Sequence, residues 1–181
     1  MSELNLSRRR LLGGALAMGG LSLMPQRAFA ALPERRLAFR NVHTNERIDA
    51  RYFGASGYDS QGLAEINHGL RDWRTGDVAN IDHGLLDLLV DIREHLSMAP
   101  RRPFDLISGY RSPRTNAALH ERSDAVAGQS QHLLGRATDI AVPGMSLDRV
   151  RLAALAQQRG GVGFYPRDGF VHVDTGRVRT W

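Results

Sequence analysis

The sequence predicts an α+β fold, in which helices pack on one face of a small antiparallel sheet. Residues 137–142 and 170–174 are predicted to be half-buried strands. The two-residue period of a strand places Asp139 opposite Ile140 and Val142, and the second segment likewise separates its polar side chains from its valines. Residues 60–74, 84–98 and 146–159 carry apolar side chains at helical spacing, and two of these segments begin at a serine that can cap a helix. The length of 181 residues and the 42% hydrophobic content suit a single domain with an ordinary core.

Three further strands are expected at residues 37–42, 47–53 and 104–108. The last one runs into Gly-Tyr-Arg-Ser at 109–112, where Ser112 before a proline indicates a helix N-cap. Arg111 therefore lies between a strand and a helix. There it is either a solvated loop charge or a guanidinium above a cleft, able to hold a carboxylate or a developing oxyanion.

The motif at residues 130–139, Ser-Gln-His-Leu-Leu-Gly-Arg-Ala-Thr-Asp, brings polar side chains to the open face of the sheet. Gly135 allows the chain to double back, so that His132 and Asp139 can converge. Alternation then places Asp139 opposite the apolar side chains of its strand.

A second polar pair follows on the strand at 170–174, where two valines face one side while His172 and Asp174 face the other. Pairing of the two strands would bring His132, Asp139 and His172 to one point. Two imidazoles and one carboxylate are usual ligands of a catalytic zinc, with a fourth position for water. The alternative is a capping histidine, a turn aspartate and an unrelated strand histidine, because short motifs recur by chance.

The pattern Ser-x-His-x-x-Gly-x-Ala-x-Asp, followed by a strand histidine, resembles the LAS zinc metallopeptidases. This family includes lysostaphin-type enzymes, D-Ala-D-Ala metallopeptidases and the hedgehog signalling domain. The positions that match are Ser130, His132, Gly135, Ala137 and Asp139. The resemblance extends from about residue 37 to residue 181, and it implies one Zn²⁺ per chain, held by His132, Asp139 and His172.

The resemblance also implies the activity: a periplasmic zinc-dependent murein endopeptidase that hydrolyses peptide cross-links of peptidoglycan, especially those between two meso-diaminopimelate residues. It implies substrate binding by Arg111. Ser130, Gln131 and Tyr165 are further expected substrate contacts. Two alternatives stay open: a zinc D,D-carboxypeptidase or dipeptidase acting on stem peptides, and a non-catalytic wall-binding domain that retains zinc.

The general base is where the chain departs from better-known relatives, several of which carry an acid or a histidine two or three residues before the second ligand histidine. This chain has Gly169 and Phe170 there. Asp174, on the same strand face as His172, is the nearest candidate, with Asp168 behind it. The alternative role of Asp174 is to hydrogen-bond a ligand histidine or the backbone.

Glycines at positions 160, 161, 163 and 169 surround the strand that carries His172. We expect them to leave a low rim and hence an open groove. Such a groove suits a substrate that continues on both sides of the scissile bond, whereas a carboxypeptidase closes on a chain end.

Residues 1–30 are predicted to be a twin-arginine signal peptide, and residues 31–181 a single zinc peptidase domain. An arginine run at 8–10 precedes a mildly apolar stretch at 11–24, and Ala-Phe-Ala at 28–30 supplies a site for signal peptidase. The expected partners in export are thus the twin-arginine translocase and signal peptidase. The alternative is an ordinary secretory signal or a short membrane anchor.

Charge and composition exclude other classes. The first thirty residues hold four of the 24 basic and one of the 19 acidic residues, so the net charge of +5 falls to +2 without them. This balance is too weak to predict nucleic-acid binding. The absence of cysteine excludes disulfides and a lipoprotein anchor. No apolar run of 18 residues follows the signal, so no stable membrane span is expected after cleavage.

Overall fold

The computed structural model describes residues 33–122 and 127–181. The predicted signal peptide, its cleavage site and the expected mature start at Ala31 lie outside the described residues. Residues 31–181 form one compact unit. Among the described residues, no helix has the length and apolarity required to cross a bilayer.

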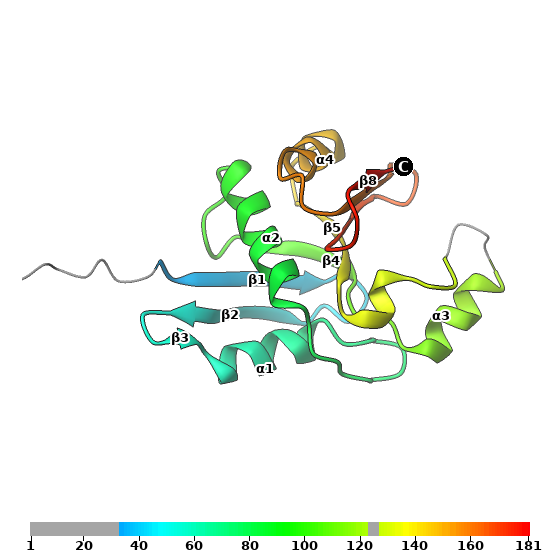
Figure 1. Ribbon diagram of the computed structural model, residues 1–181, viewed down its shortest axis with the longest axis horizontal. Coiled ribbons are helices and arrows are strands. Elements are labelled where there is room, and N and C mark those ends of the chain that lie inside the picture. Colours follow the sequence, from blue (N-terminus) through cyan, green and yellow to red (C-terminus); the bar gives the residue numbers. More distant parts are fainter. Residues whose placement is uncertain (1–32, 123–126) are drawn as a thin grey trace, which may run out of the picture. The chain divides into compact units, whose positions relative to one another are not determined.

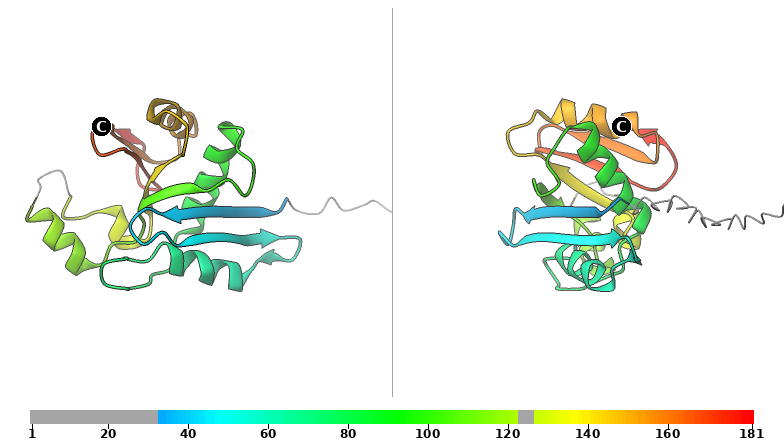
Figure 2. Two further views of the ribbon diagram at one scale, coloured as in Figure 1. Left: turned by 180° about the vertical axis from the view of Figure 1, so that it is seen from behind. Right: turned by 90° about the vertical axis from the view of Figure 1, so that its left-hand side faces the viewer.

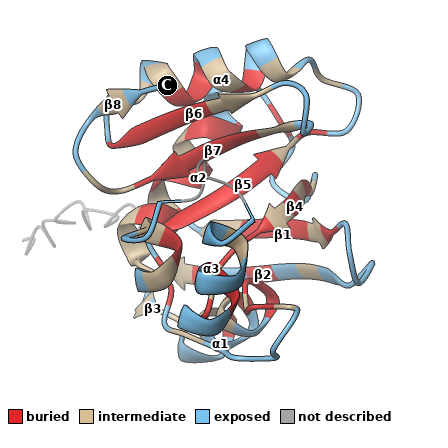
Figure 3. Ribbon diagram, turned by 90° about the vertical axis from the view of Figure 1, so that its right-hand side faces the viewer, coloured by how far each residue is buried: buried red, intermediate tan, exposed pale blue. Residues whose placement is uncertain are grey.

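In the described part of the chain, eight strands form one sheet in the order β3-β2-β1-β4-β5-β7-β6-β8 (Figures 1 and 3). Their bounds are β1 Arg35–Asn41, β2 Arg47–Gly54, β3 Gly57–Tyr58, β4 Phe104–Ser108, β5 Ala137–Ala141, β6 Gly161–Tyr165, β7 Phe170–Asp174 and β8 Arg179–Thr180.

The expectation of a purely antiparallel sheet is wrong at two places, because β1 pairs with β4 and β6 with β8 in parallel. Between β1 and β4 the chain forms two more strands and two helices, a crossover long enough for parallel pairing. β7 is already paired with β5 and β6. After the chain reverses at residues 175–178, β8 therefore pairs with the free edge of β6 and runs parallel to it.

Residues 33–122 and 127–181 contain four α-helices, namely α1 Ser60–Gly69, α2 His83–His95, α3 Pro113–His120 and α4 Leu147–Ala156, with a short 3-10 helix, η1, at Gln131–Leu134. Ser112 and Ser146 cap α3 and α4 as predicted. For α1, the cap is Asp59 rather than Ser60, since the Asp59 carboxylate accepts the N–H groups of Gln61 and Gly62. Figures 1 and 2 show α1 alongside β2.

The first two helices end earlier than predicted, at residues 69 and 95 instead of 74 and 98. Long-range hydrogen bonds replace further helical turns after α1. The Leu70 carbonyl accepts the Tyr110 N–H at 2.7 Å. The buried Asp72 carboxylate accepts both the N–H and the hydroxyl of Ser112, at 3.0 and 2.7 Å. These bonds anchor the loop after β4, which carries Arg111.

The core lies between one face of the sheet and helices α1, α2 and α4, whose buried apolar side chains form one cluster with those of the strands. Ile140, Val171 and Val173 belong to this cluster, so the polar side chains that alternate with them face the other side, as predicted. Helix α3 contributes no residue to the cluster and projects past the ends of β1 and β2 (Figures 1 and 3). The helices therefore cover one face, except for α3, which borders the polar side.

Candidate metal centre

His132 is held by a tight helical turn that ends at Gly135. The Ser130 hydroxyl accepts the His132 N–H and caps η1. Gly135 adopts a left-handed conformation with φ of 64°, and a Cβ atom there would lie 2.5 Å from the Asn80 carbonyl oxygen. Only glycine meets both demands. The predicted turn at Gly135 is thus confirmed, and it leads directly into β5.

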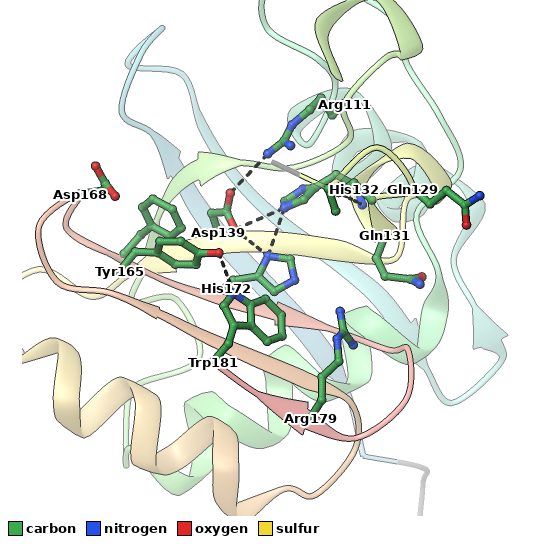
Figure 4. A pocket seen from close by; sticks show the side chains of 13 residues that line it. Arg111, Gln129, Gln131, His132, Asp139, Tyr165, Asp168, His172, Arg179 and Trp181 are labelled. Carbon is green, nitrogen blue, oxygen red and sulfur yellow. Dashed lines mark hydrogen bonds and ion pairs between the residues drawn. The ribbon is translucent and has the colours of Figure 1, made fainter. Parts of the chain in front are cut away.

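Asp139 on β5 and His172 on β7 are direct register partners in the antiparallel pair. The Asp139 Oδ1 atom lies 2.9 Å from His172 Nδ1 and 3.3 Å from His132 Nε2, and the two ring nitrogens are 3.2 Å apart. All three side chains are buried. Figure 4 shows them meeting at one point, as the sequence predicts.

In each imidazole, one nitrogen points toward the other two side chains of the cluster (the inner nitrogen) and one points away (the outer nitrogen). The hydrogen bond of the outer nitrogen determines whether the inner nitrogen carries a proton or a free lone pair. His132 Nδ1 lies 2.6 Å from the Gly109 carbonyl oxygen, which can only accept, so Nδ1 carries the proton. His172 Nε2 lies 2.9 Å from the Asp174 carboxylate, so Nε2 carries the proton of that ring. In neutral rings the inner nitrogens are then unprotonated, and two nitrogen lone pairs and one carboxylate oxygen converge. Such a donor set fits a divalent cation such as zinc.

The charge of Asp139 suits a metal ligand. Burial raises the pKa of its carboxyl, but the neighbouring His132 and His172 more than offset this effect, and the net pKa lies well below the ordinary value. Asp139 therefore remains an anion at neutral pH.

Asp174 contacts the side of the His172 ring that points away from His132 and Asp139. Its side chain is fully buried and accepts hydrogen bonds from the backbone N–H groups of Gly161 and Gly176, besides a two-point ion pair with Arg179 at 2.7 and 3.1 Å. Burial raises the pKa of its carboxyl, while the bonds from His172 and Arg179 lower it to a net value below the usual range. Asp174 does not line the cleft. This position favours the role of orienting His172 over that of general base.

Arg111 projects over the ligand cluster from the junction of β4 and α3 (Figure 4). Its Nη2 atom lies 3.7 Å from Asp139 Oδ2, and Nη1 donates to the Asn116 side-chain oxygen at 3.3 Å. The side chain is 11% exposed, and Nε is buried without a hydrogen-bond partner among the described residues. Burial lowers the pKa of the guanidinium and Asp139 partly restores it. Arg111 is thus no solvated loop charge, and it keeps a donor free.

The cluster opens into a cleft of about 390 Å³, which has Ser130, Gln131 and Tyr165 on its wall, as well as Arg111. The wall also contains Arg179 and Trp181, which sequence reasoning missed. Their alternation at the end of the chain was the available signal, but a two-residue strand gives too short a pattern to identify. Asp168 lies at the edge of the cleft, apart from the three ligands (Figure 4).

The expected low rim is wrong for three of the four glycines. Gly160, Gly161 and Gly163 are buried, because other groups fill the space above them. A Cβ atom at Gly161 would lie 2.4 Å from Arg179 Nη1, and one at Gly163 would lie 2.7 Å from the Trp181 ring. Gly169 alone among the four is exposed, with open space at its Cβ position.

The sequence of the chain matches a family of known proteins. The family described as "Peptidoglycan L,D-endopeptidase MepK" matches residues 29–181. The peptidoglycan L,D-endopeptidase MepK of Escherichia coli (strain K12) is 43% identical over the full length of both chains. The probable peptidoglycan L,D-endopeptidase MepK of Haemophilus influenzae is 36% identical over the whole of this chain and 98% of its own. Comparison with solved structures gave no match. The chain belongs to the peptidoglycan L,D-endopeptidase MepK family.

Proposed function

We propose that the protein is a zinc-dependent endopeptidase that hydrolyses peptide cross-links of peptidoglycan, those between two meso-diaminopimelate residues in particular. The observation that carries the zinc requirement is the convergence of His132 Nε2, Asp139 Oδ1 and His172 Nδ1 with both outer ring nitrogens occupied. Family membership and the names of the relatives support the substrate class.

The three converging atoms would hold the ion. When bound, zinc supplies Lewis-acid chemistry: it polarises a carbonyl group and lowers the pKa of water toward about 7. The protein's own contribution is to fix these atoms. The Gly109 carbonyl and the Asp174 carboxylate each hold one imidazole in its tautomer and orientation, the usual function of groups behind metal ligands.

Arg111 is the group that would bind the substrate's negative charge. A meso-diaminopimelate cross-link carries a carboxylate beside the scissile amide, and a guanidinium that lines the cleft can hold it or a developing oxyanion. Ser130, Gln131 and Tyr165 would also contact the substrate, since all line the same cleft.

Two aspartate variants separate the roles of base and orienting residue. We expect Asp174→Asn to weaken zinc affinity by about 10- to 100-fold, the scale for groups that orient a metal ligand. We expect Asp168→Asn to keep zinc and to lower kcat by about 10²-fold or more if this carboxylate takes the proton of the attacking water. Zinc titration and kinetics on each purified variant make the measurement. Full turnover by Asp168→Asn would assign the base to another group, and unchanged zinc affinity of Asp174→Asn would remove its orienting role.

Digestion of defined muropeptides tests the proposed reaction. The protein without residues 1–30 should convert dimers cross-linked through two meso-diaminopimelate residues to monomers and leave a terminal D-alanine in place. A chelator should stop the reaction and added zinc should restore it. Release of free D-alanine from uncrosslinked pentapeptides, with the dimers intact, would instead identify a carboxypeptidase. Binding to sacculi without any cleavage would identify a wall-binding domain.

We also propose that the chain acts in the periplasm, after export by the twin-arginine translocase and removal of residues 1–30. The arginine run at 8–10 and the Ala-Phe-Ala site at 28–30 support this route. Changing Arg8 and Arg9 together to lysine should retain the precursor inside the cell, as cell fractionation and immunoblotting would detect. Normal delivery of that variant would exclude the route, and an uncut periplasmic form would reveal an anchor.

A further inference from the structure

Trp181 lies against a metal-ligand candidate although it is far from the motif in sequence. Its indole ring is centred 5.3 Å from the His172 imidazole. The backbone N–H of Trp181 donates to the Val162 carbonyl, and the backbone carbonyl of Trp181 accepts the Phe164 N–H. These two bonds continue the pairing of β8 with β6. Trp181 is therefore held beside Gly163, the register partner of His172.

Gly163 is what permits this packing. A Cβ atom there would lie 2.7 to 2.9 Å from three atoms of the indole ring, closer than real side chains approach. Because Gly163 has no Cβ atom, the indole ring lies across β6 and approaches His172. Arg179 stacks on the indole ring, with its guanidinium carbon 4.7 Å from the ring centre. Arg179 is itself fixed by the buried Asp174, so the indole is held between a glycine and an anchored cation.

The indole has one polar atom, and it contacts Tyr165. Trp181 Nε1 donates to the Tyr165 hydroxyl oxygen at 2.7 Å. An indole nitrogen only donates, so the tyrosine oxygen must accept, and the tyrosine's own proton has to point elsewhere. Among the described residues that proton has no acceptor in hydrogen-bond reach. Phe170 stacks on the Tyr165 ring at 4.6 Å and an interplanar angle of 22°, which limits its rotation.

We propose that the Trp181 indole directs the Tyr165 hydroxyl proton into the cleft. Tyr165 then donates a hydrogen bond to the oxyanion that develops on the scissile carbonyl group, from the side opposite Arg111. Figure 4 shows Tyr165 and Arg111 on opposite sides of the ligand cluster. The inference rests on the proposed function. Within it, Tyr165 touches the reacting group, whereas Trp181 is a positioning residue that acts through Tyr165.

Single changes and their combination test the pair. Tyr165→Phe removes the donor, and Trp181→Phe keeps an aromatic ring but removes the N–H. We expect Tyr165→Phe to lower kcat by about 10²-fold, the scale for one donor to an oxyanion, with a smaller loss in Trp181→Phe. The double variant should be no worse than Tyr165→Phe, because Trp181 acts only through that hydroxyl. KM, zinc content and thermal unfolding should change little.

Trp73→Phe is the matched control, because Trp73 is the other of the two tryptophans and does not line the cleft. It should keep wild-type kcat. In that background Trp181 is the single indole, so Tyr165→Phe should shift its fluorescence emission, in the presence or absence of zinc and substrate. Gly163→Ala should shift the emission as well and should lower kcat, since it displaces the ring.

The outcomes distinguish the inference from the proposed function. If the unaltered protein cleaves no muropeptide, the proposed function fails, and the emission shift still tests the hydrogen bond. If the unaltered protein is active, wild-type kcat in Trp181→Phe overturns the positioning role. Losses that add in the double variant also overturn it, since they indicate a separate packing role for Trp181. Unchanged emission on Tyr165→Phe overturns the hydrogen bond itself.

Discussion

The variant His132→Ala is expected to bind almost no zinc and to hydrolyse no cross-link. His132 supplies one of only three converging donor atoms among the described residues, and its orientation depends on the Gly109 carbonyl at 2.6 Å. Loss of an outer hydrogen-bond partner typically lowers metal affinity by about 10- to 100-fold, and loss of the ligand itself should exceed this. Metal analysis after dialysis, together with a muropeptide digest, gives the measurement.

His95→Ala is the matched control. His95 is an exposed histidine at the end of α2, and the same substitution there should leave one zinc per chain and full activity. The folded state of His132→Ala should persist because the hydrophobic cluster does not include the three ligands. Full zinc occupancy in His132→Ala would contradict the assigned site. Unfolding of this variant would instead indicate a structural metal, and circular dichroism distinguishes that case.

Arg111→Ala is expected to lose about 2–4 kcal/mol of transition-state stabilisation while zinc remains bound, which is the scale for removing one donor to an oxyanion. The reason is its position: the guanidinium lines the cleft, is only 11% exposed and lies 3.7 Å from Asp139 Oδ2. Arg111→Lys should restore only part of the loss, because an ammonium group cannot form the two-point contact of a guanidinium.

Arg114→Ala provides the control for charge. It removes the same charge from an exposed arginine three residues away that does not line the cleft. Its kcat/KM should stay close to that of the unaltered protein. Equal losses in Arg111→Ala and Arg114→Ala would mean that the general electrostatic field, not a specific contact, explains the effect. Unchanged kcat/KM in Arg111→Ala would end its proposed role.

The convergence of His132, Asp139 and His172 was predictable because its determinants are local. Alternation alone placed Asp139 and His172 on one face of their strands, and a single glycine indicated the turn that brings in His132. The caps at Ser112 and Ser146 were equally local, each a short side chain that bonds the N–H of a residue in the first helical turn.

Features that depend on distant partners were not predictable. The parallel pairing of β1 with β4 depends on which strand edges remain free after folding. The early end of α1 depends on Tyr110, some forty residues later. The contacts of Asp174 with Arg179 and with two backbone N–H groups are of this kind, and its carboxylate does not line the cleft. The burial of three glycines at the expected rim was not predictable either, because the side chains of Arg179 and Trp181 cover Gly161 and Gly163, and the backbone of Asp174 covers Gly160.

All described residues that line the cleft come after residue 110, although the sheet begins at residue 35. The strands β1, β2 and β3 therefore contribute no residue to the lining of the cleft. For protein engineering, the turn at residues 55–56, between β2 and β3, is a suitable place to insert an affinity tag or a fluorescent reporter while the cleft keeps its shape.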